Sequence, residues 1–287
     1  MQHQPAAAPG PDQPRQYATA PLPWRIEDID LSAIDVAQVR DDDTLFFMLT
    51  TAAFVEIASD VYTRNLSGYY ANDPDVLAWL NQSWEQEEIQ HGRALRDYVR
   101  AVWPELDWDG ANAAFFEEYS ARCTLDEFEP SQALEMAARC VVETGTASYY
   151  RMLYDYTDEP VLKRIVGNIG TDEVRHYSHF LRFFGKCADR DLPTRWQVAR
   201  AVARRVAEAG DDDALIAFRH AFRMRYPQRA FEQREYDAYR AKLRGIMRRH
   251  LPAEMAVKML LKPVRLPARV QRLLAPALAR VSVLAFI

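Results

Sequence analysis

Two short segments place a glutamate and a histidine three residues apart, as the pairs Glu88 with His91 and Glu173 with His176. Residues three apart share one face of a helix, and in both segments that face also carries large apolar residues. A charged side chain on such a core-facing stripe is costly unless something pairs with it. The two pairs therefore predict a buried site where carboxylates and imidazoles meet a cation.

A lone glutamate precedes each of these pairs along the chain. Glu56 lies in the apolar run TLFFMLTTAAFVEIASDVY, and Glu143 lies in ARCVVETGTASYY. Glu56 is 32 residues before Glu88 and Glu143 is 30 residues before Glu173, so one helix pair occurs twice in the chain. A single glutamate or an isolated Glu-x-x-His is usually an ordinary surface feature, but the repetition favours one shared site.

The charges of these six residues indicate what would bind them. Four buried carboxylates that face each other would repel, and would take up protons or destabilise the fold. Two divalent cations would balance the four negative charges, and two neutral imidazoles would complete the ligand set. Carboxylate and imidazole ligands suit iron or manganese better than metals that prefer thiolates. We therefore predict a dinuclear site for two iron or manganese ions.

Long helices are needed to bring these residues together. The chain has only 10 glycines, and long stretches are rich in Ala, Leu, Glu and Arg, which favours helix. No alternating strand pattern is present. The four long helices are expected at about 44–66, 74–102, 130–156 and 160–184, and shorter ones at 111–122, 193–209, 212–225 and 229–250. Short connections within each pair predict an all-α four-helix bundle with additional C-terminal helices.

The chain is expected to have three parts. Residues 1–23 are predicted to be a disordered tail, 24–190 the bundle, and 191–287 further helices that pack on it. Residues 195–287 carry 20 Lys and Arg against 8 Asp and Glu, whereas the preceding residues carry 16 against 33. The basic part predicts either solvated helix faces or a dock for an acidic partner. Nucleic acid is not expected, because acidic residues interrupt the basic run and no DNA-binding motif is present.

Cysteine usage and hydropathy indicate the compartment. The three cysteines are widely spaced and form no CxxC motif, which argues against a disulfide scaffold and favours a reducing cytoplasm. The N-terminal segment lacks the pattern of a signal peptide. A stretch of about 18 apolar residues, which a spanning helix needs, is not apparent. We therefore expect a cytoplasmic protein without a transmembrane segment.

The repeated ligand pattern resembles the ferritin-like di-iron superfamily, for which this set of glutamates and histidines is known. The segments EEIQHGRAL (87–95) and TDEVRH (171–176) are similar to those of the soluble acyl-acyl carrier protein desaturases, and the resemblance covers about residues 20–185. It implies terminal carboxylate ligands, bridging carboxylates and nitrogen ligands. The expected terminal ligands are Glu56 and Glu143, and the expected bridging carboxylates are Glu88 and Glu173. The expected nitrogen ligands are His91 and His176.

The resemblance also implies roles for four further residues. Thr146, three residues after Glu143, would assist proton delivery or oxygen handling. Glu87 and Asp172 would each orient the histidine of the opposite pair, a common way to fix the tautomer of a metal-binding histidine. Trp24 would relay electrons towards the site, with a packed N-terminal aromatic as the alternative.

The activity implied by the resemblance is O₂-dependent desaturation of an acyl chain on acyl carrier protein, by a homodimer that takes electrons from a ferredoxin-like donor. The acidic carrier is expected to dock on an arginine-rich segment, which consists of Arg219, Arg223, Arg225 and Arg229. The C-terminal half shows no similarity to the family, and FVEIA lacks the family's doubled glutamate. A di-iron hydroxylase or N-oxygenase would share the ligand set. Further alternative functions are iron storage and peroxide detoxification. The chain could also be a ribonucleotide reductase small subunit, with Tyr62 or Tyr150 as its radical residue.

Overall fold

The computed structural model describes residues 20–123, 128–208 and 212–285. Over these residues the chain is helical and contains no strand, so the predicted all-α fold is confirmed. Most of the predicted N-terminal tail, residues 1–19, lies outside the described residues.

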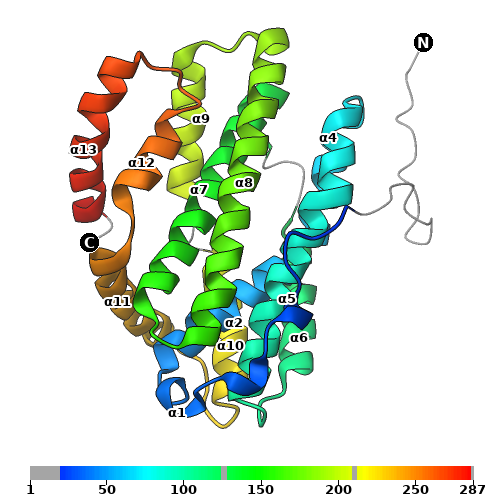
Figure 1. The fold of residues 1–287 in the computed structure, drawn as a ribbon, viewed down its shortest axis with the longest axis vertical. Coiled ribbons are helices and arrows are strands. Elements are labelled where there is room, and N and C mark those ends of the chain that lie inside the picture. The colour runs from blue at the N-terminus through cyan, green and yellow to red at the C-terminus, as the bar shows by residue number, and fades with distance from the viewer. Residues whose placement is uncertain (1–19, 124–127, 209–211, 286–287) are drawn as a thin grey trace.

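Four long rods form the bundle (Figure 1). They are α2 (Asp43–Ile57) with α3 (Ser59–Tyr69); α4 (Pro74–Trp79) with a π-helical turn (Leu80–Trp84) and α5 (Glu85–Val102); α7 (Gln132–Tyr156); and α8 (Pro160–Asp191). The closest packing is within two pairs, α2 against α5 and α7 against α8. Each pair carries one lone glutamate and one Glu-x-x-His, as the sequence repeat predicts.

A side-chain cap starts each rod and explains why the helices begin where they do. Asp42 accepts from the backbone N–H of Leu45, Asp73 from that of Val76 and Ser131 from that of Leu134. Glu159 accepts from the first N–H groups of α8 and also from the Tyr98 hydroxyl of α5, at 2.9 Å. These caps satisfy N–H groups that have no partner within the helix.

The rods differ from the sequence-based boundaries at two positions. The first rod breaks at Ala58, whose N–H bonds to the carbonyl of Val55 three residues back and so tightens the last turn of α2. The fourth rod continues through Gly185, because a single glycine costs a helix only about 1 kcal/mol. It ends instead at Asp191, and the following residue, Leu192, adopts a left-handed conformation with φ 48°.

The remaining helices surround the bundle. They are η1 (Ile26–Asp28), η2 (Leu31–Ala33), α1 (Val36–Val39), α6 (Trp108–Ser120), α9 (Arg195–Glu208), α10 (Asp212–Arg225), α11 (Gln233–His250), α12 (Ala253–Leu261) and α13 (Ala268–Ala285). α10 packs on α2 and α6, α9 and α12 pack on α7, and α13 packs on α12. Phe218, Phe222 and Tyr239 belong to the same apolar core as residues of α2 and α5.

Within the described residues, one helical stretch meets the length and composition of a membrane span, which the sequence-based prediction did not anticipate. It is Asp43–Tyr69, the first rod of the bundle, and 72% of its apolar window is buried inside the protein. A buried core helix passes the same test, so this stretch is weak evidence for a membrane span.

Candidate dinuclear metal site

The structure brings the six predicted ligands together in two overlapping groups. Within each group, one oxygen or nitrogen atom per residue lies within 4.8 Å of the others. The groups are Glu56, Glu88, His91 and Glu173, and Glu88, Glu143, Glu173 and His176. All six residues are buried. Glu88 and Glu173 belong to both groups, which is the position that a carboxylate bridging two cations would occupy.

Atoms without hydrogen bonds point into this cluster. Buried polar atoms are seldom left unpaired, yet five of the candidate ligand atoms make no hydrogen bond. They are Glu88 Oε1, His91 Nδ1, Glu143 Oε2, Glu173 Oε1 and His176 Nδ1. The two Nδ1 atoms lie 3.1 Å from Glu173 Oε1 and 2.9 Å from Glu88 Oε1. Four carboxylates and two imidazoles with unused lone pairs fit two iron or manganese ions in both charge and ligand type.

The second nitrogen of each histidine is held by an acidic residue from the opposite helix pair. His91 Nε2 lies 3.0 Å from Asp172 Oδ2, and His176 Nε2 lies 2.7 Å from Glu87 Oε2. A proton on Nε2 that is donated to the carboxylate leaves the Nδ1 lone pair facing the cluster. The structure therefore places Glu87 and Asp172 where they can fix both the tautomer and the orientation of the imidazoles.

Burial and neighbouring charges change the proton affinity of the cluster. Burial, followed by the charges of Glu88 and Glu173, raises the pKa of Glu56 well above its usual value. Burial also raises the pKa of Glu143 to about 8. Burial alone would lower the pKa of His91, but the Asp172 contact and the Glu173 charge raise it to about 10. Without cations the cluster therefore retains protons, which metal binding would have to displace.

Asp172 gives a test of the histidine orientation. Asp172→Asn is expected to lower metal affinity about 10- to 100-fold, because an amide can present its own donor to His91 Nε2 and favour the wrong tautomer. Titration of the metal-free protein with Co(II), followed by absorbance, would measure the change. The matched control is Asp158→Asn, at a side chain that is 89% exposed. Equal affinities of the two variants would contradict the positioning role.

Thr146 lies beside the cluster on α7. Its hydroxyl is 2.6 Å from Glu173 Oε2 and donates to it. Thr144, two residues earlier, instead donates to the carbonyl of Cys140 within its own helix, at 2.6 Å. The structure thus places Thr146, and not Thr144, in contact with a candidate ligand.

Trp24 reaches the same cluster from the N-terminal segment. Its Nε1 donates to Asp172 Oδ2 at 2.7 Å. Its ring is nearly parallel to that of His91, with an interplanar angle of 5° and centroids 6.3 Å apart. Gln90 Nε2 donates to the Trp24 carbonyl at 2.9 Å and fastens the segment to α5. Asp172 therefore contacts both the indole and the imidazole through one oxygen.

Two residues of the site were not identified from the sequence in these roles. Arg175 pairs with Glu87 and, at 2.9 Å, with Asp172 Oδ1, so that it joins the two acids that hold the histidines. The sequence signal that could have identified Arg175 was its position three residues after Asp172. Tyr150 donates its hydroxyl to Glu56 from a buried position two turns after Glu143. The other tyrosine considered as a radical residue, Tyr62, is hydrogen-bonded to Tyr119 at 2.7 Å.

The predicted arginine dock is only partly available. Arg219 pairs with Glu118 and Arg225 pairs with Asp43, and their side chains are 24% and 17% exposed. These two arginines therefore tie α10 to α6 and α2, and the docking of an acidic carrier on them stays a prediction. Arg223 and Arg229 are exposed, although Arg229 also pairs with Glu235 at 2.8 Å.

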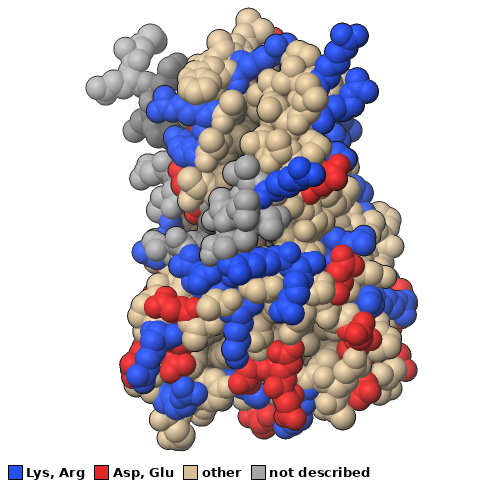
Figure 2. All heavy atoms as spheres, turned by 90° about the vertical axis from the view of Figure 1, so that its left-hand side faces the viewer, with Lys and Arg blue, Asp and Glu red and all other residues tan. Residues whose placement is uncertain are grey.

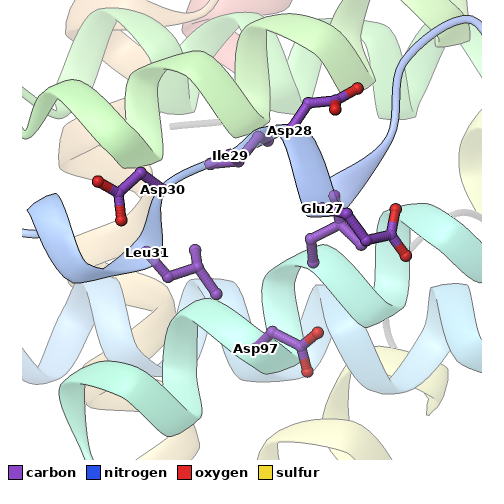
Figure 3. Close-up of a pocket in the computed structure, with 7 residues that line it drawn as sticks. Glu27, Asp28, Ile29, Asp30, Leu31 and Asp97 are labelled. Carbon is purple, nitrogen blue, oxygen red and sulfur yellow. The ribbon is translucent and has the colours of Figure 1, made fainter.

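Two surface hollows lie near the bundle. One of about 600 Å³ lies between the N-terminal segment and α5 and is lined mainly by acidic residues, including Glu27, Asp28, Asp30 and Asp97 (Figure 3). The other, of about 520 Å³, lies between α8 and α12. None of the six candidate ligands lines either hollow, so both lie apart from the cluster.

Comparison with known proteins gives one informative similarity. No family model matches the chain. In two strains of Mycobacterium tuberculosis, the protein named "Putative acyl-[acyl-carrier-protein] desaturase DesA2" is 30% identical over 148 residues, which are 50% of this chain and 49% of the relative. The chain thus spans about half the length of the curated relatives it matches. Over that half the chain is similar to a protein named as a desaturase, and its buried glutamate and histidine cluster is compatible with a di-iron oxidoreductase.

Proposed function

We propose that the protein is an O₂-dependent di-iron desaturase that introduces a double bond into an acyl chain carried on acyl carrier protein. The observation that carries the proposal is the meeting of six buried ligand residues in two groups that share Glu88 and Glu173. The similarity to DesA2, which is named as a desaturase of this kind, supports this reaction among those that such a cluster can perform.

The atom balance of the reaction defines what else is required. Two hydrogens leave adjacent carbons of the acyl chain, and with one O₂, two electrons and two protons the products are a double bond and two water molecules. Two iron ions held by the six residues would supply the oxygen activation and the oxidising power. The two electrons must come from outside the chain, and we propose a ferredoxin-like donor. A cytoplasmic homodimer is part of the same proposal.

The surrounding residues have separable tasks in this proposal. Glu87 and Asp172 keep the proton on Nε2 of each imidazole and leave Nδ1 free for a cation. Thr146 holds a proton at its hydroxyl beside Glu173. Trp24 and Asp172 form a continuous contact from the N-terminal segment to His91, which would be the route by which electrons enter.

The experiment that tests the proposal is a single-turnover reaction. The protein is loaded with iron without oxygen, reduced, and exposed to air with acyl carrier proteins that bear chains of several lengths. Mass spectrometry of the released acyl chains is expected to show the loss of two hydrogens. Gain of an oxygen atom would replace the proposal with an oxygenase. Iron accumulation in a large hollow oligomer, without any change of the acyl chain, would replace it with storage.

Thr146→Val is expected to lower the yield of desaturated product about 100-fold or more, because a positioned proton donor typically contributes that much. The substitution keeps the shape of the side chain but removes the donor to Glu173. Iron content should stay at the wild-type value, since Thr146 is not a candidate ligand. The control is Thr144→Val, whose hydroxyl bonds only within its own helix. Full activity of Thr146→Val would exclude the proton-handling role.

A further inference from the structure

Helix α13 (Ala268–Ala285) turns small residues towards the protein and large apolar residues away from it. Ala275 and Ala279 are buried next to α12, with 3% and 8% exposure. Leu273, by contrast, is 78% exposed, and Val270, Leu274 and Leu278 are 38%, 38% and 41% exposed. The outward apolar residues follow the i, i+3, i+4, i+7, i+8 spacing of one helix face. They are Val270, Leu273, Leu274, Ala277 and Leu278.

In most surface helices such a stripe faces the core. The outward direction of the stripe on α13 therefore indicates that these residues have a role other than packing in the core. An exposed apolar stripe on a helix of this length marks an interaction surface. The described part of the chain contributes only α12 as an extensive contact of α13. Among the described residues, the leucines of this stripe therefore remain exposed and available to a partner.

Basic residues run beside the apolar stripe. Arg269, Arg272 and Arg280 are exposed and share the adjoining side of α13. Residues 233–280, which include α11 and α12, carry 12 Lys and Arg against 3 Asp and Glu. Figure 2 shows the side of the molecule on which α13 lies, where blue side chains form a band across the middle and red side chains mix with blue ones below the band. The partner of the leucine stripe must therefore tolerate or prefer the positive charge that lies beside it.

We propose that α13 and the adjoining basic surface bind a lipid bilayer that contains anionic headgroups, with α13 lying in the interface. An amphipathic helix with leucines on one side and arginines beside them buries its apolar side at the boundary between headgroups and acyl chains. Each basic residue near the surface adds attraction to anionic lipid. The inference stands independently of the desaturase proposal, since it uses none of the site residues.

Charge argues against a second copy of the chain as the partner. A two-fold contact through α13 would place two basic faces opposite each other, and like charges at an interface oppose association. An anionic bilayer satisfies both features at once, because its headgroups neutralise the arginines and its acyl chains accept the leucines.

Flotation of the full chain with lipid vesicles tests the proposal. Binding is expected to vesicles of phosphatidylcholine with phosphatidylglycerol, and to weaken as salt rises. Leu273→Ser with Leu278→Ser is expected to weaken binding at least about tenfold, because apolar burial in the bilayer is lost. Arg269→Glu with Arg272→Glu is expected to weaken it by a similar factor. The replaced side chains project from the protein, so circular dichroism and Tm should stay unchanged.

A matched control separates binding through α13 from nonspecific adsorption by exposed apolar residues elsewhere. Leu192 and Trp196 are each 77% exposed and lie outside α13. Leu192→Asn suits the left-handed backbone there, and together with Trp196→Ser it should leave vesicle binding unchanged.

Four outcomes would overturn the proposal. The first is that the wild-type protein does not bind phosphatidylglycerol vesicles, and the second is that the leucine variant binds them as well as the wild type does. The third is that the leucine variant converts a dimer into a monomer. The fourth is that the α13 variants lose binding to acyl carrier protein but still bind vesicles. The third would assign the face to a second copy of the chain, and the fourth to an acidic protein.

Discussion

Glu173→Ala is expected to empty both metal positions, whereas Glu56→Ala is expected to empty one. Glu173 belongs to both groups of candidate ligands, and Glu56 belongs to only one. Loss of the shared carboxylate removes a negative charge from each group and leaves His91 without the oxygen that lies 3.1 Å from its Nδ1. We expect iron content to fall from two ions per chain to well below one in Glu173→Ala, and to about one in Glu56→Ala.

Elemental analysis of anaerobically loaded protein measures this difference in iron content. The effect of a chelator on thermal stability is a second test of metal binding that does not depend on enzyme activity. Metal that binds only the folded chain stabilises it, so a chelator should lower the Tm of the wild-type protein. The same chelator should leave the Tm of Glu173→Ala unchanged. Glu117→Ala, at an exposed position on α6, is the control and should behave like the wild type. Two bound ions in Glu173→Ala would contradict the bridging assignment.

Gly92→Ala is expected to destabilise the protein, although alanine favours helix over glycine by about 1 kcal/mol. A Cβ atom at Gly92 would lie 2.5 Å from Cγ1 and 2.6 Å from the backbone nitrogen of Ile57, and 3.0 Å from the carbonyl oxygen of Ala53. Backbone atoms cannot turn aside as a side chain can, so α5 and α2 would have to separate. Overpacking of this kind typically costs about 1–3 kcal/mol. We expect a net loss of about 1–2 kcal/mol in the free energy of unfolding.

The same separation reaches the metal site. Ile57 follows Glu56, and Gly92 follows His91, so the two helices touch immediately beside two candidate ligands. Gly92→Ala should therefore lower metal affinity as well as stability. Gly68→Ala is the control, because nothing lies within 4 Å of a Cβ atom there. That variant should be neutral or slightly more stable in chemical denaturation. If Gly92→Ala gained stability as well, the close approach of α2 and α5 would be disproved.

The sequence predicted the bundle from periodic spacing within single helices, and it predicted the candidate ligands from that spacing together with the repeat of the helix pair. Glu88 and His91 share a face by helical geometry alone, and the repeat places Glu173 and His176 in the same way. The ends of the rods were less predictable. Gly185 lies inside α8 because Phe184 and Cys187 remain buried on either side of it, and tertiary packing of this kind outweighs the local preference of one residue.

Contacts between distant segments could not be obtained from spacing. Arg225 pairs with Asp43, 182 positions away, and Arg219 pairs with Glu118, 101 positions away. The sequence shows that these arginines are numerous but not which of them are used internally. Arg175 was missed for the same reason, since its second partner, Glu87, comes from another rod. Pairing across helices depends on how the rods cross, and a pattern within one helix does not contain that information.

The division of the ligands between the two helix pairs has a consequence for the ancestry of the site. The α2/α5 pair supplies three of the four residues of one group and a single residue of the other, and the α7/α8 pair does the reverse. Two identical copies of one such hairpin, associated by a two-fold axis, would therefore already enclose both groups. All six candidate ligands could therefore come from two copies of a single helix pair. Duplication and fusion of a short gene would have kept this ligand set and allowed the two halves to diverge in sequence.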